Sequence, residues 1–156
     1  YLYDPGQQVL RLEGAELIND MEGARFLFCN DYEFGLISKK TGWSLDQMLQ
    51  HVKALVITRG KDGADLYMGG DSVHIPTVPE REIVDPTGVG DAFRGGFLAG
   101  YSRGFDWKIC GEIGSLAAVY CLEQKGPQSH GYSRKEFVER FREHFEDEKK
   151  LDSLLV

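Results

Sequence analysis

A glycine-rich turn that ends in an aspartate, residues 85–91, carries the clearest potential for chemistry in this sequence. Gly88 and Gly90 allow the backbone to turn where a Cβ would obstruct it, and Asp91 follows within the first turn of an expected helix. The first N–H groups of a helix have no acceptor inside it, and the helix dipole adds partial positive charge there. Such a turn favours a phosphate group, and Asp91 could accept a proton from a hydroxyl group held beside it.

Other interpretations of this glycine turn (residues 85–91) are possible, because ordinary helix starts also contain glycine and aspartate. Two familiar nucleotide-binding patterns are excluded by spacing: Phe93 stands where GxGxxG requires its third glycine, and GxxxxGK[ST] has no match in the sequence. A flavin or NAD oxidoreductase is therefore disfavoured. If the turn does surround an anion, we expect a positive φ at Gly90, which a β-branched residue cannot adopt without strain.

Polar residues also follow two expected strands, residues 26–29 and 54–58. The first strand is followed by Asn30 and Glu33, whose spacing is typical of a helix cap. Thr58 ends the second strand and leads into a tight glycine turn before a further strand. Ligands of open α/β sheets collect at such strand ends, so both places are candidate parts of a site.

The elements that would position these residues follow from apolar periodicity. Residues 1–3 read as a strand, a helical pattern ends at Met21, and residues 54–58 form a continuous apolar run typical of a strand buried on both faces. A capping box at Ser44 begins a helix with apolar residues at 45, 48, 49 and 52. Residues 64–68 and 72–78 are predicted to form an antiparallel pair. The sequence therefore predicts an α/β fold with a mostly parallel sheet and helices on both faces.

The second half of the sequence is predicted to be largely helical. A helix follows the glycine turn, with Gly95 and Gly96 allowing close backbone approach, and residues 107–123 form an apolar, buried helix. Another begins at a capping box on Ser133. We expect the charged residues 146–150 to be a solvated helix end, and residues 151–156 either to pack on another part of the protein or to fray.

Composition limits the possible partners. The 156 residues suffice for one domain, and 18 basic against 25 acidic residues give a net charge of −7. This charge disfavours nucleic acid or an anionic membrane as a partner, and no apolar run is long enough to cross a membrane. Three cysteines without a CxxC pair indicate core residues in a reducing cytoplasm, not a disulfide framework or a zinc site.

The run DPTGVGDAFRGGFLAG, residues 85–100, closely resembles the C-terminal signature of the ribokinase-like (PfkB) carbohydrate and nucleoside kinases. The resemblance implies ATP-dependent phosphorylation of a sugar or nucleoside hydroxyl, with Asp91 as the base and Gly88, Val89 and Gly90 as the anion hole. It implies that Asn30 and Glu33 order a hydrated Mg²⁺. The implied ATP contacts are Asn30, Thr58, Arg59, Gly60, Gly63, Thr87, Ala118 and Gly126, and a monovalent-cation site is implied near the anion hole.

The sequence indicates the molecule that accepts the phosphoryl group less clearly than it indicates the family. Residues 123–130 look most like the adenosine-kinase-like members, which favours adenosine over ribose, fructose or other nucleosides, and His130 is expected to be a hydrogen-bonded loop residue. The resemblance covers only the C-terminal half of the family, and Tyr1 begins a strand already under way, so we expect the N-terminal half with most acceptor-binding residues and the lid to be absent. Such a half-domain alone is expected to be inactive and prone to associate, for example as a homodimer. The alternative is a non-catalytic nucleotide- or phosphate-binding half-domain.

Overall fold

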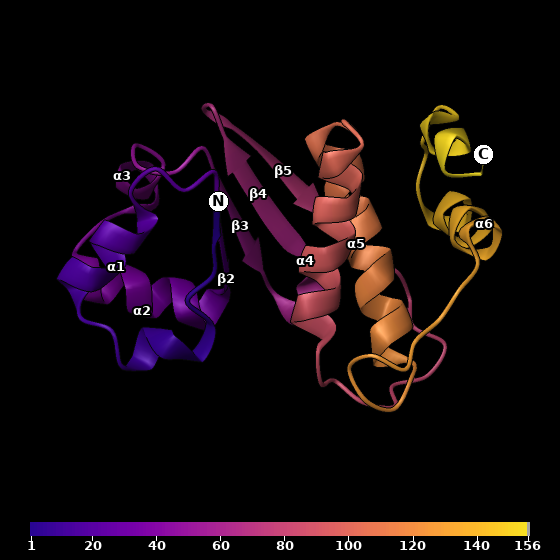
Figure 1. Cartoon of the computed structure of the whole chain (residues 1–156), viewed down its shortest axis with the longest axis horizontal. Coiled ribbons are helices and arrows are strands. Elements are labelled where there is room, and N and C mark those ends of the chain that lie inside the picture. The colour runs from indigo at the N-terminus through magenta and orange to yellow at the C-terminus, as the bar shows by residue number, and fades with distance from the viewer. Residues whose placement is uncertain (156) are drawn as a thin grey trace. The chain divides into compact units, whose positions relative to one another are not determined.

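The computed structural model describes residues 1–155, which form two compact units, the first ending at His74 and the second beginning at Ile75 (Figure 1). Among these residues, no helix is both long and apolar enough to cross a membrane. The three cysteines are free and buried, as core residues are expected to be.

A mixed five-stranded sheet organises the first unit, with its strands in chain order. Strand β1 (Leu2–Tyr3) pairs in parallel with β2 (Phe26–Asn30), and β2 pairs in parallel with β3 (Ala54–Thr58). Strand β4 (Ala64–Met68) is antiparallel to β3. The prediction of a mostly parallel sheet thus holds for the first three strands only.

The last strand is shorter than predicted. Strand β5 (Asp71–Ile75) follows β4 after only two glycines, both with positive φ, and such a short connection requires antiparallel neighbours. The sequence predicted this strand over residues 72–78, but Pro76 has no N–H group to continue the ladder. Residues 76–84, the lead segment, contain no helix or strand, so the glycine turn does not follow a strand directly.

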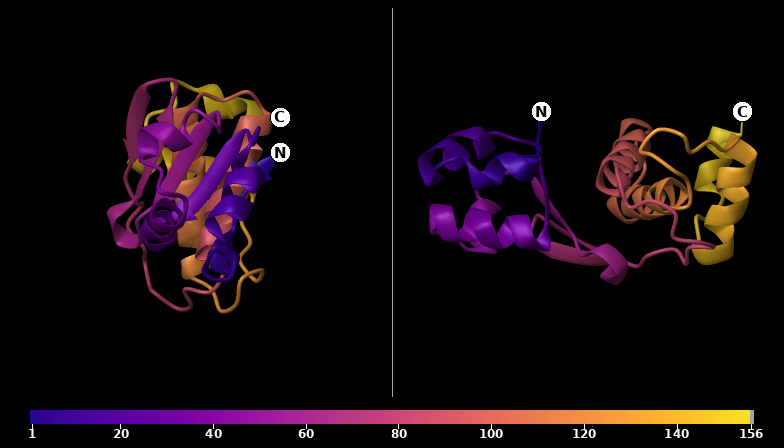
Figure 2. Two further views of the ribbon diagram at one scale, coloured as in Figure 1. Left: turned by 90° about the vertical axis from the view of Figure 1, so that its left-hand side faces the viewer. Right: turned by 90° about the horizontal axis from the view of Figure 1, so that it is seen from below.

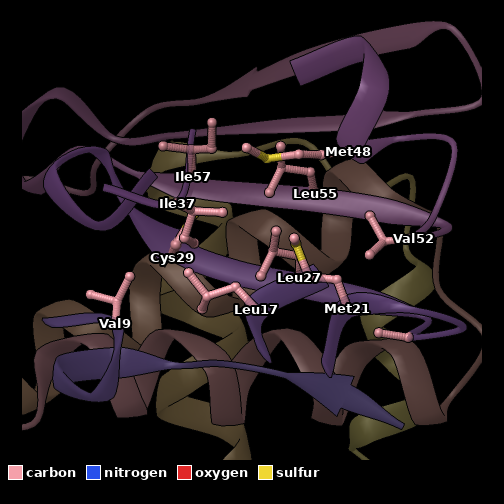
Figure 3. Close-up of a cluster of buried hydrophobic side chains, with 11 residues drawn as sticks. Val9, Leu17, Met21, Leu27, Cys29, Ile37, Met48, Val52, Leu55 and Ile57 are labelled. Atoms are coloured by element: carbon pink, nitrogen blue, oxygen red, sulfur yellow. The ribbon is translucent and has the colours of Figure 1, made fainter. Parts of the chain in front are cut away.

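The core of the first unit lies between β2 and β3 and the helices beside them (Figure 3). Leu27 and Leu55 are fully buried there, and alternation along each strand places Cys29 and Ile57 on the same face. The covering elements are η1 (Gly6–Leu10), α1 (Gly14–Met21), α2 (Asp31–Thr41) and α3 (Leu45–Met48). Figure 3 shows their apolar side chains pointing toward those of the strands.

Helix α3 is shorter than its apolar spacing predicted. Its capping box at Ser44 is present, but the helix ends after Met48. The chain then turns so that His51 stacks on Trp43 at 4.1 Å and pairs with Glu22 at 2.7 Å. Val52 is nevertheless buried, so the expected apolar positions reach the core without continuing the helix.

The second unit consists mainly of three helices: α4 (Val89–Ser102), α5 (Trp107–Leu122) and α6 (Arg134–His144). Helices α4 and α5 lie side by side (Figure 1 and the right-hand view of Figure 2). The apolar stripe predicted for α6 is confirmed, since Phe137, Phe141 and Phe145 are all buried. Together with α5 they form the core of this unit.

Glycine allows α4 and α5 to approach closely. A Cβ at Gly96 would lie 2.8 Å from Ala117 Cβ and 2.9 Å from the Ile113 carbonyl oxygen. A Cβ at Gly114 would lie 2.8 Å from the Phe93 carbonyl oxygen. The prediction of close approach is therefore confirmed for Gly96 but wrong for Gly95, which has no atom within 4 Å of such a Cβ.

Alanine substitutions at these adjacent glycines are expected to act in opposite directions. Gly96→Ala should lower the free energy of unfolding by about 1–3 kcal/mol, because the added methyl group meets backbone atoms that cannot rotate away. Gly95→Ala should raise it by about 0.5–1 kcal/mol, because it reduces backbone entropy in the unfolded chain without a clash. Urea denaturation of both variants tests the contact, and equal effects would contradict it.

The C-terminal region is more ordered than predicted. Asp147 is buried rather than solvated, since it accepts hydrogen bonds from Arg142 at 2.9 and 3.1 Å and from the Leu151 N–H group at 2.9 Å. The helix α6 has already ended at His144. The following 3₁₀-helix η3 (Lys150–Leu154) places Leu151 in the core of the second unit, so the described part of residues 151–156 packs within this chain.

Candidate functional site

The N-terminus of α4 differs from those of its neighbours in having no side-chain cap. Its N-cap is Gly88, which has no side chain to accept from the first N–H groups. A side-chain oxygen fills this position in α2, α3, α5 and α6. The first-turn N–H groups of Gly90 and Asp91 therefore depend on an acceptor from outside the helix.

Gly88, and not Gly90, is the glycine whose backbone requires a positive φ. Its φ is 82°, and a Cβ placed on it would lie 2.4 Å from Pro127 Cβ. Gly90 is already part of α4 and has no positive φ, so the prediction of a strained conformation there was wrong. The helix begins at Val89, two residues earlier than a left-handed Gly90 would require, so the left-handed residue is Gly88.

Asp85 holds the glycine turn against the loop that follows α5. Its Oδ1 accepts from the Thr87 N–H group and its Oδ2 from the Gly126 N–H group, both at 2.9 Å. This bridge was not predicted from the sequence, although an aspartate that accepts from the N–H group two residues on is a known turn signal. Cys121 adds a weaker contact, with Sγ 3.5 Å from the Thr87 carbonyl oxygen.

This bridge predicts a dependence of stability on pH. Hydrogen bonds from the Thr87 hydroxyl and N–H groups, and from the Gly126 N–H group, lower the pKa of Asp85. A lowered pKa stabilises the fold above the unfolded pKa of about 3.9, and this contribution is lost as pH falls through the folded value. Wild type should exceed Asp85→Asn in unfolding free energy from about pH 7 to 5, and the difference should shrink below about pH 4. Urea titrations of both proteins test this, and a constant difference would contradict it.

Asp91 is accessible to a substrate. Its side chain is 79% exposed, and its Oδ1 lies 3.0 Å from Nη2 of Arg94, one turn further along α4. It stands in the first turn, beside the N–H groups that lack an acceptor in the helix. A carboxylate in this position could accept a proton from a group held at the same helix end.

The remaining predicted residues of the second unit lie on or after α5. Ala118 is a buried residue of that helix, and Gly126 has a φ of 85° in the loop that follows. His130 lies further along this loop, and its Nδ1 is buried with no hydrogen-bond partner in the described part of the chain. His130 was expected to be a hydrogen-bonded loop residue, and its Nδ1 does not make such a bond within residues 1–155.

In the first unit, the structure brings the predicted residues of β2 and β3 to one sheet edge. Asn30 and Thr58 are paired in register as the last residues of their parallel strands. Asn30 Oδ1 accepts from the Glu33 N–H group, and Glu33 Oε2 accepts from the Asn30 N–H group, both at 2.8 Å. This capping box begins α2 at the carboxyl end of the parallel strands.

A tight turn carries the other predicted residues of the first unit. Arg59 donates its N–H group to the Gly63 carbonyl oxygen at 2.8 Å, and both Gly60 and Gly63 have positive φ. The Arg59 side chain is bound by Asp65 at 2.6 Å, which also lies 2.7 Å from His74. Partial burial opposes ionisation of Asp65, but the hydrogen bonds from His74 and Arg59 outweigh it and lower its pKa.

Comparison with known proteins identifies relatives for this arrangement. A family model described as pfkB family carbohydrate kinase matches residues 7–133. A nucleoside kinase of Methanocaldococcus jannaschii is 35% identical over 142 residues, which cover 91% of this chain and 47% of that protein. The chain spans about half the length of the curated relatives it matches.

Solved structures give the same result. The crystal structure of the M. jannaschii nucleoside kinase, described as an archaeal member of the ribokinase family, has a TM-score of 0.89 at 35% identity. A Burkholderia thailandensis nucleoside kinase in complex with inosine has a TM-score of 0.90 at 42% identity. Each match covers 92% of this chain and 48% of the known one.

Proposed function

Because the chain belongs to the pfkB family of carbohydrate kinases, whose model matches residues 7–133, we propose that the whole protein transfers the γ-phosphoryl group of ATP to a nucleoside or sugar hydroxyl. The observation that carries this proposal is the uncapped N-terminus of α4 with the exposed Asp91 beside it. Phosphoryl transfer needs positioning and charge stabilisation more than covalent chemistry, and a helix N-terminus offers both.

The N-terminus of α4 fits a phosphate group. Gly88 leaves the first-turn N–H groups without a side-chain acceptor, and no larger residue fits its place against Pro127. In the proposed mechanism the N–H groups of Gly88, Val89, Gly90 and Asp91 stabilise the charge that develops on the transferred group. Asp91 accepts the proton of the acceptor hydroxyl as the hydroxyl oxygen attacks the γ-phosphorus, and the bond from that phosphorus to the β–γ bridging oxygen breaks to release ADP.

Further roles are proposed from the family. A magnesium ion bound to the nucleotide would neutralise phosphate charge, and Asn30 and Glu33 would supply oxygen atoms that order this ion and its bound water. Thr87 and Gly126, held by Asp85, are proposed nucleotide contacts, and a monovalent cation is proposed near the same loop. The other proposed nucleotide contacts are Thr58, Arg59, Gly60, Gly63 and Ala118.

A nucleoside is the proposed acceptor, with adenosine as the first candidate. Both solved relatives described above are nucleoside kinases, and one of them contains inosine. Adenosine itself is proposed from residues 123–130 and from the stretch Asp4–Gln8, which resemble adenosine-kinase-like members. We place the reaction in the cytoplasm, because all three cysteines are free.

The test is phosphoryl transfer by the full-length protein with ATP and Mg²⁺, measured on adenosine, inosine, cytidine, ribose and fructose. A nucleoside should be phosphorylated fastest. Nucleotide binding without transfer to any acceptor would favour the alternative of a non-catalytic nucleotide-binding module.

Residues 1–156 alone are proposed to bind ATP weakly, to associate, for example as a homodimer, and to lack turnover. This proposal follows from the family resemblance, which implies that most acceptor-binding residues lie outside residues 1–156. Size-exclusion chromatography beside titration with ATP and Mg²⁺ tests this proposal, and a monomer that phosphorylates adenosine would contradict it.

A further inference from the structure

The lead segment (residues 76–84) reaches the glycine turn along the carboxyl end of α5. The Leu122 carbonyl oxygen accepts from the N–H groups of Val84 and Asp85 at 3.0 and 3.1 Å. One residue further on, Glu123 Oε1 accepts from the Arg81 N–H group at 2.7 Å. The path of the backbone into Asp85 is therefore fixed by two consecutive residues at the end of α5.

Glu123 is itself held by Arg140 of α6. The two side chains form a bidentate pair, with Nη1 2.7 Å from Oε2 and Nη2 2.6 Å from Oε1. The Arg140 side chain is 4% exposed, and the Glu123 side chain is 10% exposed. The guanidinium also lies 4.7 Å from the centre of the Tyr120 ring, and its Nη2 lies 3.4 Å from the Pro79 carbonyl oxygen. Arg140 thus contacts the lead segment both directly and through Glu123.

A buried ion pair of this kind contributes geometry more than stability. The cost of removing both charges from water offsets much of their attraction, so an apolar pair of similar size is often equally stable. The fork of the guanidinium, however, fixes the carboxylate in one orientation, which a lysine or an apolar side chain cannot do. The orientation of Glu123 sets the position of Arg81, and with it the direction of the lead segment.

We propose that Glu123 and Arg140 are positioning residues for the phosphoryl transfer, acting through the lead segment on the glycine turn. Their pair holds the segment that ends at Asp85, and Asp85 holds the N–H groups of Thr87 and Gly126. A displacement of about 1 Å at such a site can lower a rate by about 100-fold. This inference rests on the proposed kinase function.

The test uses the full-length protein with both charges replaced, Glu123→Leu with Arg140→Met. The matched control is Arg142→Met with Asp147→Leu, which removes another bidentate pair at the end of the same helix. We expect the first variant to lower kcat by at least about 10-fold with the acceptor KM within about 3-fold. The control should keep kcat within about 3-fold of the wild-type value, even if its Tm falls as much as that of the first variant.

Hydrogen exchange supplies a readout that does not depend on activity. In the first variant the amide protons of Arg81, Val84 and Asp85 should exchange at least about 10-fold faster than in wild type, and the control should leave them unchanged. If the double variant does not fold, Arg140→Lys keeps the charge but loses the fork, and it should show the same two changes to a smaller degree.

The outcomes separate the two proposals. Unchanged exchange at Arg81, Val84 and Asp85, or a kcat equal to that of the control, would overturn the positioning role. A wild-type protein that phosphorylates no acceptor would overturn the proposed function instead, and the exchange measurement would still decide whether the ion pair holds the lead segment.

Discussion

Asp91→Asn is expected to lower kcat of the full-length protein by at least about 100-fold, because an amide cannot accept the hydroxyl proton as a carboxylate does. The KM for ATP should stay within about 3-fold, since the N–H groups at the start of α4 remain in place. Folding should be little affected. The side chain is 79% exposed, and exposed ion pairs such as Asp91–Arg94 contribute at most about 1 kcal/mol.

The matched control is Asp46→Asn, which removes an exposed carboxylate from the first turn of α3. Both variants lose a carboxylate in the first turn of a helix, and Asp91→Asn also loses the exposed pair with Arg94, so both should show only a small change in Tm. Only Asp91→Asn should lose activity. A kcat close to that of wild type would remove Asp91 from the role of base, and an equal loss in Asp46→Asn would indicate a general effect on folding.

Gly88→Val is expected to lower the free energy of unfolding by at least about 2 kcal/mol and to weaken ATP binding by at least about 10-fold. A β-branched residue is strained at a φ of 82°, and its Cβ would overlap Pro127. Relief of this overlap requires the glycine turn to separate from the loop that carries Gly126, which would displace the first-turn N–H groups from their positions around a phosphate. Calorimetric titration with ATP and urea denaturation measure the two effects.

Gly90→Ala is the control for this substitution. Gly90 has no positive φ, and a Cβ there would approach only the end of the Arg94 side chain, at 3.3 Å. The Gly90→Ala variant should therefore keep its affinity for ATP within about 3-fold of wild type and its free energy of unfolding within about 1 kcal/mol. If Gly90→Ala were as damaging as Gly88→Val, the assignment of the strained position to Gly88 would be wrong.

Most helices could be predicted because the signals that define them are local. The capping boxes at Asn30, Ser44 and Ser133 are all present, and the buried helix predicted over residues 107–123 forms over Trp107–Leu122. The early end of β5 has a local cause in Pro76, but the other failures depended on contacts between distant residues. Helix α3 ends early where His51 pairs with Glu22, a contact that no local pattern contains.

The glycine turn illustrates the same division. Its residue types predicted a helix N-terminus with free N–H groups, and α4 begins there. Which glycine adopts the left-handed conformation was predicted wrongly, because the choice depends on Pro127 in a loop beyond the next helix. The Asp85 bridge to Gly126 was not predicted for the same reason. The roles of Asn30 and Glu33 toward magnesium stay predictions.

The close contact of α4 and α5 also determines which sequence changes could compensate one another. Truncating Ala117 to glycine would remove one of the three atoms that a methyl group at position 96 would meet, but the Ile113 carbonyl oxygen and the Gly114 Cα belong to the main chain. No side-chain substitution in α5 can move those two atoms. A second mutation near Gly96 therefore cannot make a larger residue acceptable at this position. A larger residue there requires the two helices to separate along their whole contact.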